Sequence, residues 1–471
     1  MNPRMPFRRT ARTTPPALAT TVATPLSPTT PAAPASSGPE SAPASLPRPR
    51  IGRGRVWKAA LLASLLPLTA AAPALAGPSI AHPAPDPNKT GLVEKKLVPD
   101  LVGTMQKLRI PGAIVSVTMQ KWGTTTAALG TDYLGSGLQM DAAEHLRIGD
   151  VTRTFTGTVI LQLAGEHRIG LDEPVARLVS GVPNGRLITV RQLLRMTSGL
   201  YDYAEDPALN KALDQHPDAR FTPHDVLAVA FRHQPYFAPG KGFHDSATDT
   251  VLLGMIAERV TRQPLQTLFQ QRIFRPLGMK DTRIDNGVTL PDPHARGYQF
   301  GTNTDALTAP VLSGKDAAWA DFSAGKPTDV TTSNASWAWA AGAATSTVAD
   351  LNRWAPALAT GKLLTPQMRK EQMLLMPTSV KAARTASPSA AKPTAMLGSA
   401  AYGATSYGLA LADYAGFLGH AGRVPGYSSI VTYDPKRQAT VVIMVNSSRS
   451  PDGSVPANEL MKRVLADVFD G

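Results

Sequence analysis

The chain has 471 residues, a formal net charge of +13 and no cysteine. The lack of cysteine excludes disulfides, thiol catalysis and thiolate metal sites. Residues 1–58 hold nine Lys or Arg residues and one Glu, which leaves a net charge of +5 for the rest of the chain. This modest excess argues against nucleic-acid binding, which needs a clustered basic surface.

The first 76 residues predict no folded domain. Residues 1–47 are rich in Pro, Ala, Thr and Ser and poor in large apolar side chains, so we expect them to be disordered. Residues 48–76 hold a basic segment, an apolar run and a small-residue ending at Ala76, which is the order of a secretory signal peptide. The apolar run is shorter than the ~20 residues that span a bilayer. We therefore expect cleavage after Ala76, no stable membrane span, and a secreted or cell-envelope location outside the cytoplasm. The alternative to cleavage is a membrane anchor that is not cut. A start of translation further downstream would explain why the signal follows a long disordered segment.

The remaining residues, 77–471, predict one domain of the α+β class. Apolar residues at helical spacing mark its two ends, and short β-rich runs lie next to them. In chain order we expect a helix at 91–108, strands at 113–119, 124–129, 429–433 and 439–445, and a final helix at 458–469.

Strands at both ends of the domain predict one antiparallel sheet that is assembled from both termini and flanked by the terminal helices. A mainly helical subdomain is inserted between them. We assign the α/β part to residues 88–140 and 340–471 and the helical part to residues 141–339. Within it we expect helices at 190–200, 226–233, 248–260 and 265–274, and residues 378–395 are interpreted as a surface insertion.

Residues 147–174 are the most informative segment. Their apolar side chains fall mostly at helical spacing, and the run closes at Gly165. Asp150 stands where the helix would begin, and Arg153 follows three residues later. This spacing favours Asp150 as an N-cap that is paired with Arg153, with a ligand-binding role as the alternative.

Six segments in order carry a resemblance that covers about residues 91–465. They are RIPGAIVSV (109–117), ITVRQLLRMTSGLYDY (188–203), TDTVLLGMIAERVT (248–261), IFRPLGMKDT (273–282), WAAGAATSTVADLNRW (339–354) and GHAGRVPGYSS (419–429). The chain resembles the class C beta-lactamase and serine D-alanyl-D-alanine carboxypeptidase group. The resemblance implies the beta-lactamase/transpeptidase-like fold and a cleft in which three motifs meet.

The first motif of that group is Ser-x-x-Lys, in which the Ser attacks a carbonyl and the Lys assists proton transfer. Asp150 and Arg153 stand at these two positions. A carboxylate beside an arginine and at a helix start is a good hydrogen-bond acceptor and a poor acyl nucleophile. A guanidinium does not deprotonate in a protein, so Arg153 cannot act as the base.

The other two motifs are also altered. Where the group has Tyr-x-Asn, this chain has Asp245, Ser246 and Ala247, so both functional side chains are missing. The third motif, Lys-Thr-Gly or His-Thr-Gly, survives in part as His420, Ala421 and Gly422. The resemblance places substrate binding at Ala247, Ala421 and Gly422. The glycine would let a ligand backbone approach closely.

The altered motifs predict a pseudoenzyme of the cell envelope that lacks acyl-serine chemistry and binds a cell-wall peptide or a beta-lactam-like small molecule. No cofactor and no metal site are expected. One alternative is a hydrolase with an altered site, in which Asp150, Asp245 and His420 converge and activate water. Metal binding by the same three residues is disfavoured, because Arg153 places a fixed positive charge beside them. Another alternative is an interaction module in which the Pro-rich residues 1–47 carry the function.

Overall fold

The computed structural model describes residues 93–284, 287–308, 327–378 and 403–469. The predicted disordered segment 1–47 and the predicted signal peptide 48–76 lie outside the described residues. So does the predicted surface insertion 378–395, apart from Thr378. The following description concerns the described part of the folded domain.

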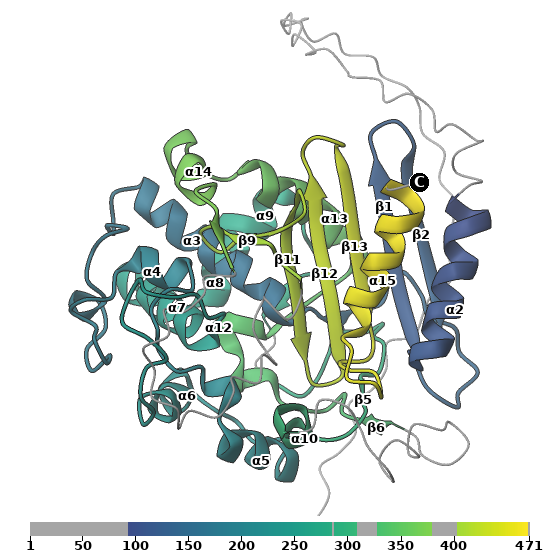
Figure 1. Cartoon of the computed structure of the whole chain (residues 1–471), viewed down its shortest axis with the longest axis horizontal. Coiled ribbons are helices and arrows are strands. Elements are labelled where there is room, and N and C mark those ends of the chain that lie inside the picture. Colours follow the sequence, from purple (N-terminus) through teal and green to yellow (C-terminus); the bar gives the residue numbers. More distant parts are fainter. Residues whose placement is uncertain (1–92, 285–286, 309–326, 379–402, 470–471) are drawn as a thin grey trace, which may run out of the picture. The chain divides into compact units, whose positions relative to one another are not determined.

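An eight-stranded antiparallel sheet forms the framework of the domain, with the strand order β2-β1-β13-β12-β11-β10-β9-β8 (Figure 1). Strands from the two ends of the chain meet in its middle, where β1 pairs with β13. The strand bounds are β1 Gly112–Met119, β2 Gly123–Gly130, β8 Met376–Pro377, β9 Ser406–Tyr407, β10 Ala412–Tyr414, β11 Phe417–Val424, β12 Tyr427–Asp434 and β13 Ala439–Val445.

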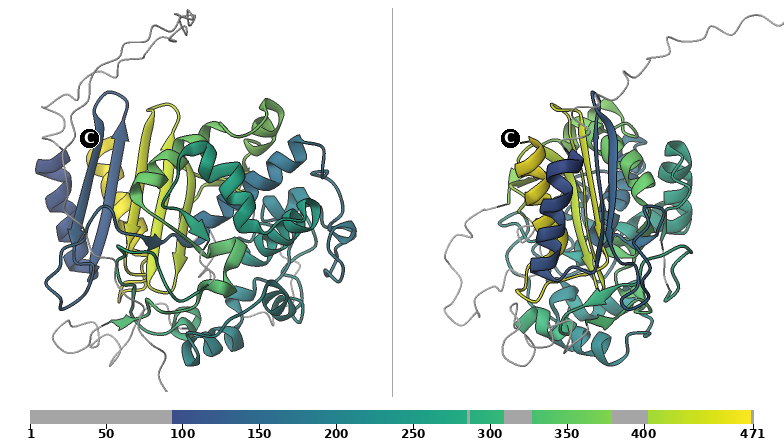
Figure 2. Two further views of the ribbon diagram at one scale, coloured as in Figure 1. Left: turned by 180° about the vertical axis from the view of Figure 1, so that it is seen from behind. Right: turned by 90° about the vertical axis from the view of Figure 1, so that its right-hand side faces the viewer.

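Two terminal helical segments cover one face of this sheet (Figure 2, right). The first consists of η1 Val93–Leu97 and α2 Val98–Leu108, and the second consists of α15 Pro456–Val464 and η8 Leu465–Phe469. Val441 and Ile443 of β13 belong to the apolar core on this face, whereas Val442 and Met444 belong to the core on the opposite face. Because β13 is buried on both faces, its sequence is continuously apolar.

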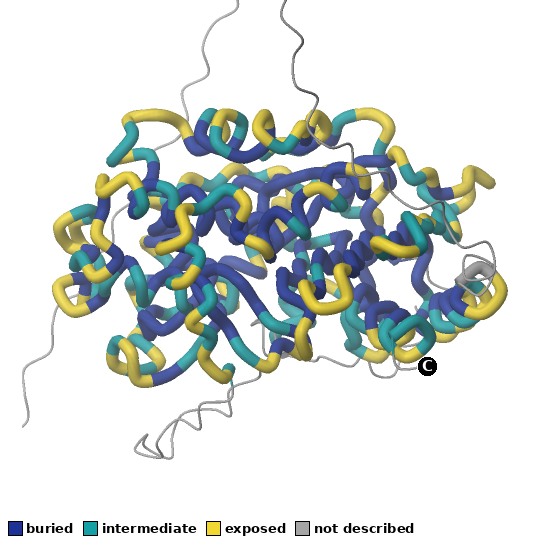
Figure 3. Tube along the Cα trace, turned by 90° about the horizontal axis from the view of Figure 1, so that it is seen from above, coloured by how far each residue is buried: buried dark blue, intermediate teal, exposed yellow. Residues whose placement is uncertain are grey.

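The opposite face of the sheet is covered by helices of the middle of the chain, and α13 (Val348–Thr360) packs against β12 and β13. Phe155 and Trp354 pack against each other in this core with their rings tilted by 54° and their centroids 4.8 Å apart. Figure 3 shows buried segments in the interior of the domain and exposed turns around them. The remaining helices are η2 Gly149–Val151, α3 Thr152–Gly165, η3 Val175–Arg177, α4 Val190–Leu194, η4 Tyr203–Glu205, α5 Pro207–Gln215, α6 Pro223–Ala230, α7 Ala247–Thr261, α8 Leu265–Phe269, η5 Gln270–Phe274, α9 Arg275–Leu277, α10 Asn303–Thr308, η6 Ala335–Trp337, α12 Trp339–Gly342 and α14 Pro366–Gln372.

Two small sheets lie in the middle of the chain. One contains β3 (Leu146–Arg147), β7 (Ala344–Ser346) and β4 (Arg283–Ile284), and the other pairs β5 (Tyr298–Gln299) with β6 (Thr328–Asp329). The backbone of β3 leads directly into η2 and α3. This small sheet therefore anchors the start of the helix at which the sequence places the first altered motif.

The predicted α+β architecture is confirmed, including the antiparallel sheet, the flanking terminal helices and the mainly helical middle. Two predicted helices have bounds that are wrong by more than two residues. The helix predicted at 190–200 ends at Leu194, because the chain turns at Met196 (φ 58°) and Gly199 (φ 79°). The helix predicted at 226–233 begins earlier, at Pro223, where Thr222 forms a capping box with Asp225. The bounds predicted at 265–274 are confirmed, since α8 and the π-helical η5 together cover these residues.

No helix in the described ranges is both long and apolar enough to cross a membrane.

Candidate functional site

Three charged side chains meet where α3, the loop before α7 and the start of η2 come together, and we call them the arginine cluster: Asp150, Arg153 and Asp245. Arg153 Nη2 donates to Asp150 Oδ1 at 2.7 Å, and Arg153 Nη1 donates to Asp245 Oδ1. The side chains of Arg153 and Asp245 are 3% and 0% exposed. One guanidinium therefore joins the first and second altered motifs in the interior of the protein.

The charge of Arg153 is fixed by these two carboxylates. Burial lowers the pKa of Arg153, but Asp150 and Asp245 outweigh it and raise that pKa well above its ordinary value. Because the guanidinium keeps its proton, it cannot accept one from a nucleophile. The arginine cluster therefore links the start of α3 to the loop before α7, and it is not suited to transfer protons.

The predicted pair between Asp150 and Arg153 is present, but the predicted N-cap is wrong. The N-cap residue of α3 is Val151, which has no side-chain cap, and Asp150 lies in η2 before it. Asp150 Oδ2 instead accepts a hydrogen bond from the backbone N–H of Arg423 in β11, at 3.2 Å. The carboxylate thus bridges α3 and the sheet, since it can bond Arg153 with one oxygen and β11 with the other.

The third motif lies on β11 in the interior. His420 is completely buried, and its Nε2 lies 3.1 Å from the hydroxyl of Tyr407 on β9. Its Nδ1 lies 2.5 Å from the carbonyl oxygen of Ala421, an acceptor, so Nδ1 carries the proton and the Tyr407 hydroxyl donates to Nε2. Burial lowers the pKa of His420, which favours the neutral ring. The imidazole is held by two partners as a neutral side chain.

The space in front of Gly422 is filled by the protein itself. A Cβ at this position would lie 2.1 Å from the carbonyl oxygen of Ile148 and 2.8 Å from the backbone nitrogen of Asp150. Across the same contact, a Cβ at Gly149 would lie 2.5 Å from the nitrogen of Arg423. On this side Gly422 lies against the backbone of Ile148 and Asp150, and its role in substrate binding stays a prediction.

A cavity of about 70 Å³, partly open to solvent, lies beside the arginine cluster. Asp150, Arg153 and Ala247 line it, whereas Asp245, His420, Ala421 and Gly422 are not among its lining residues. The wall also contains the rings of Phe300 and Trp337, the amides of Asn210, Gln299 and Asn303, and the basic side chains Arg423 and Arg449. The cavity thus offers apolar, amide and cationic groups to a ligand, as small-molecule sites commonly do.

The segment of the second motif points mostly inward. Asp245 and Ser246 are each 1% exposed, and no described residue forms a hydrogen bond with Ser246 Oγ or with Asp245 Oδ2. Ser246 is also absent from the cavity lining, so this hydroxyl does not reach a ligand there. Ala247 is the first residue of α7 and donates its N–H to Asp202 Oδ1 at 3.2 Å.

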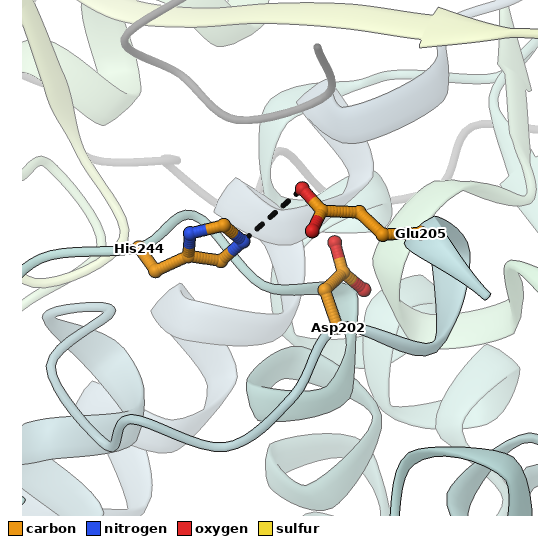
Figure 4. A group of neighbouring side chains, drawn as sticks. All are labelled: Asp202, Glu205 and His244. Carbon is orange, nitrogen blue, oxygen red and sulfur yellow. Dashed lines mark ion pairs between the residues drawn. The ribbon is translucent and has the colours of Figure 1, made fainter. Parts of the chain in front are cut away.

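A second polar cluster, the histidine cluster, lies next to the cavity and consists of Asp202, Glu205 and His244. One ligand atom from each residue lies within 4.8 Å of the others, which is an arrangement that can hold a metal ion. Figure 4 shows the Glu205 carboxylate directed toward the imidazole of His244 and one oxygen of Asp202 directed toward the Glu205 carboxylate. Sequence reasoning missed this cluster, because Asp202 and Glu205 belong to none of the three motifs and His244 is about forty residues away.

Asp202 is the member that also lines the cavity. It is 1% exposed, and burial followed by the neighbouring Glu205 raises the pKa of Asp202 to about 7. The pKa of His244 is also raised: burial lowers it, but the interaction with Glu205, 3.2 Å away, outweighs burial. The single positive charge that His244 can carry therefore offsets only part of the negative charge that Asp202 and Glu205 can carry.

The structure thus brings Asp150, Arg153 and Asp245 together, and it places His420 in the adjacent core. The alternative of a water-activating set needs Asp150, Asp245 and His420 to face one cleft. Arg153 binds both carboxylates, and only Asp150 of the three lines the cavity. The catalytic and substrate-binding roles that the resemblance implies for the motif positions stay predictions.

Comparisons with known proteins agree with this fold. A profile of the beta-lactamase family matches residues 99–466. Protein flp of Staphylococcus aureus (strain MW2) is 29% identical over 218 residues, which are 44% of this chain and 42% of that protein. Penicillin-binding protein 4* of Bacillus subtilis (strain 168) is 29% identical over 35% of this chain and 36% of its own length. The match spans less than half of each of these relatives.

Solved structures show the same likeness over a longer range. A D-stereospecific amidohydrolase from Streptomyces sp. has a TM-score of 0.61 and 29% identity, covering 79% of this chain and 100% of its own. D-amino acid amidase from Ochrobactrum anthropi SV3 has a TM-score of 0.64 at 24% identity over 81% of this chain and 99% of its own, which shows the fold alone. With the sheet, the helical insertion and the three motif positions in place, the chain belongs to the beta-lactamase family of serine hydrolases.

Proposed function

We propose that this protein is a pseudoenzyme of the cell envelope, which binds a cell-wall peptide or a beta-lactam-like small molecule without acyl-serine chemistry. The observation that carries the proposal is the position of Arg153, whose guanidinium bonds Asp150 and Asp245 at the positions of the missing nucleophile and of the missing tyrosine. A side chain with a permanent charge occupies the place where a proton-accepting amine would be needed. The site therefore has neither the nucleophile nor the base that would be needed to form an acyl-enzyme.

The cavity supports the binding part of the proposal. Its aromatic rings, Phe300 and Trp337, suit an apolar group, and its amides suit a peptide bond. Arg423 and Arg449 give part of the wall a positive charge, which favours a ligand with a carboxylate. A short peptide with a free carboxyl end combines these features, and this is the ligand class that we expect.

The export of the protein is part of the same proposal. A basic, an apolar and a small-residue segment follow one another in residues 48–76. We expect the mature protein to begin at Gly77. Mass spectrometry of the N-terminus of the protein, isolated from the envelope or the medium of the producing cell, tests this.

Binding is tested with an acylated peptide that ends in D-Ala-D-Ala, by calorimetry together with chromatography of the peptide after incubation. We expect the peptide to bind and to be recovered intact. Trp337→Ala, which removes an aromatic wall of the cavity, should weaken binding about tenfold. Trp122→Ala is the matched control, because Trp122 is not among the cavity-lining residues, and it should leave binding unchanged. Cleavage of the peptide by the natural protein, or equal effects of the two variants, would contradict the proposal.

A further inference from the structure

The histidine cluster presents three donor atoms of two kinds at one point. Nε2 of His244 lies 3.2 Å from Oε1 of Glu205, and the carboxylate of Asp202 completes a set within 4.8 Å. An imidazole nitrogen with two carboxylates is a donor set that zinc and similar divalent ions accept. The three residues come from η4, from the residue that precedes it and from the loop before α7, so the fold brings them together from distant parts of the sequence.

One of these donors is left without a hydrogen bond inside the protein. The His244 Nε2 atom is buried and lies 3.2 Å from Glu205 Oε1, but no described residue forms a hydrogen bond with it. Asp202 is 1% exposed, and its Oδ1 accepts from the N–H groups of Ala204 and Ala247. An unpartnered polar atom at a buried site is costly, and a bound cation would satisfy it.

The cluster is also held in place from behind. The Tyr236 hydroxyl donates to Glu205 Oε2 at 2.6 Å and accepts from the backbone N–H of Asp202 at 3.2 Å. The ring of Tyr236 lies against the His244 ring, with centroids 4.1 Å apart. One side chain thus orients all three donors, which is the arrangement of outer hydrogen bonds that metal ligands commonly have.

We propose that Asp202, Glu205 and His244 bind one divalent transition-metal ion beside the cavity, with zinc as the ion that the donor set favours. This departs from the expectation of no metal site, which considered only Asp150, Asp245 and His420. The two sets differ in how Arg153 acts on them: it bonds Asp150 and Asp245 directly, whereas it acts on Asp202 through its charge, which lowers the pKa of that carboxyl.

The geometry requires only small side-chain movements. Zinc ligands lie ~2.0–2.1 Å from the ion, so donor atoms around it are about 3.4 Å apart. The pair of His244 and Glu205 already has that separation, at 3.2 Å. The carboxylate of Asp202 borders the cavity, so an ion held there would lie at the edge of the ligand site. The proposal concerns binding of an ion and does not depend on whether the cavity is catalytic.

Calorimetry on the full chain, freed of metal by a chelator and titrated with zinc chloride, tests the proposal. We expect one equivalent of zinc to bind, and we expect Glu205→Gln to raise its dissociation constant tenfold or more. His233→Gln is the matched control. His233 pairs with Asp206 at 2.8 Å and stacks on Tyr201, so it is a similar pair outside the proposed donor set, and its loss should leave the affinity unchanged.

A second readout separates a lost ligand from a lost fold. Cobalt(II) bound by one imidazole and two carboxylates gives visible absorption bands, which should form in the natural protein and in His233→Gln and should be absent in Glu205→Gln. The thermal unfolding midpoint of each variant without metal shows whether it is folded. Failure of the natural protein to bind zinc, or equal affinity of the three folded proteins, would overturn the proposal.

Discussion

The arginine cluster and the histidine cluster differ in how their buried carboxylates are neutralised. In the first, a guanidinium with a permanent charge bonds Asp150 and Asp245 directly. In the second, Asp202 and Glu205 share one imidazole, which carries a charge only when it is protonated, and burial raises the pKa of Asp202 to about 7. The comparison teaches that direct ion pairs with a permanent cation join the altered motif positions, whereas the carboxylates of the histidine cluster depend on a partner whose charge changes with pH.

The comparison first predicts a large loss of stability when the cation of the arginine cluster is removed. Arg153→Met leaves Asp150 and Asp245 near each other without their common partner, and Asp245 is completely buried. Breaking a buried pair from one side costs about 3–5 kcal/mol of the free energy of unfolding. Urea denaturation of the natural and variant proteins at pH 7 measures this difference.

A triple variant serves as the control for that experiment. A protein that carries Asp150→Asn, Arg153→Met and Asp245→Asn together has no charge left in the arginine cluster. We therefore expect most of the lost stability to return. If Arg153→Met alone is as stable as the natural protein, the arginine cluster is not the structural element described here.

A carboxylate that has no ion pair with a described residue sharpens the comparison. Glu144 is 4% exposed, and its Oε2 has no hydrogen bond with a described residue. Burial, followed by the charge of Asp132, raises the pKa of Glu144 from 4.5 to about 7. Between these two pH values the side chain is ionised in the unfolded chain and neutral in the folded one. Its contribution therefore destabilises the fold progressively as the pH rises from 4.5 to 7.

Glu144→Gln removes this effect. The variant should be as stable as the natural protein near pH 4.5 and more stable at pH 7, by up to about 3 kcal/mol for the full shift. Urea denaturation at several pH values between 4.5 and 7.5 measures the difference between the two proteins. A difference that stays constant with pH would show that Glu144 is ionised in the folded state.

The main strands and helices of the domain could be predicted from the sequence, because buried strands and helical turns leave regular patterns of residues. The run at β13 is apolar on both faces because it lies between two cores, and such a run is readable as a buried strand. The pair of Asp150 and Arg153 was predictable from a spacing of three residues along one helical turn. The short strands β8, β9 and β10 were missed, because two or three residues carry no readable alternation.

The site was predictable only in part, because its contacts join loops that are distant in sequence. The bond of Arg153 to Asp245 crosses 92 residues, and no local pattern indicates it. The histidine cluster depends on the turn after Gly199 and on the loop that brings His244 beside it. The spacing of Asp202 and Glu205, three residues apart, was the only signal in the sequence, and it is common in ordinary loops.

The central proposal is that this chain forms no acyl-enzyme, and labelling of the purified protein with a fluorescent penicillin tests it most directly. The natural protein should carry no covalent label after denaturing electrophoresis. A variant with Asp150→Ser, Arg153→Lys, Asp245→Tyr and Ala247→Asn restores the motif residues and shows whether the cavity still accepts the reagent. Strong labelling of the natural protein would contradict the account, because it would require a nucleophile that neither Asp150 nor the residues around Arg153 supply.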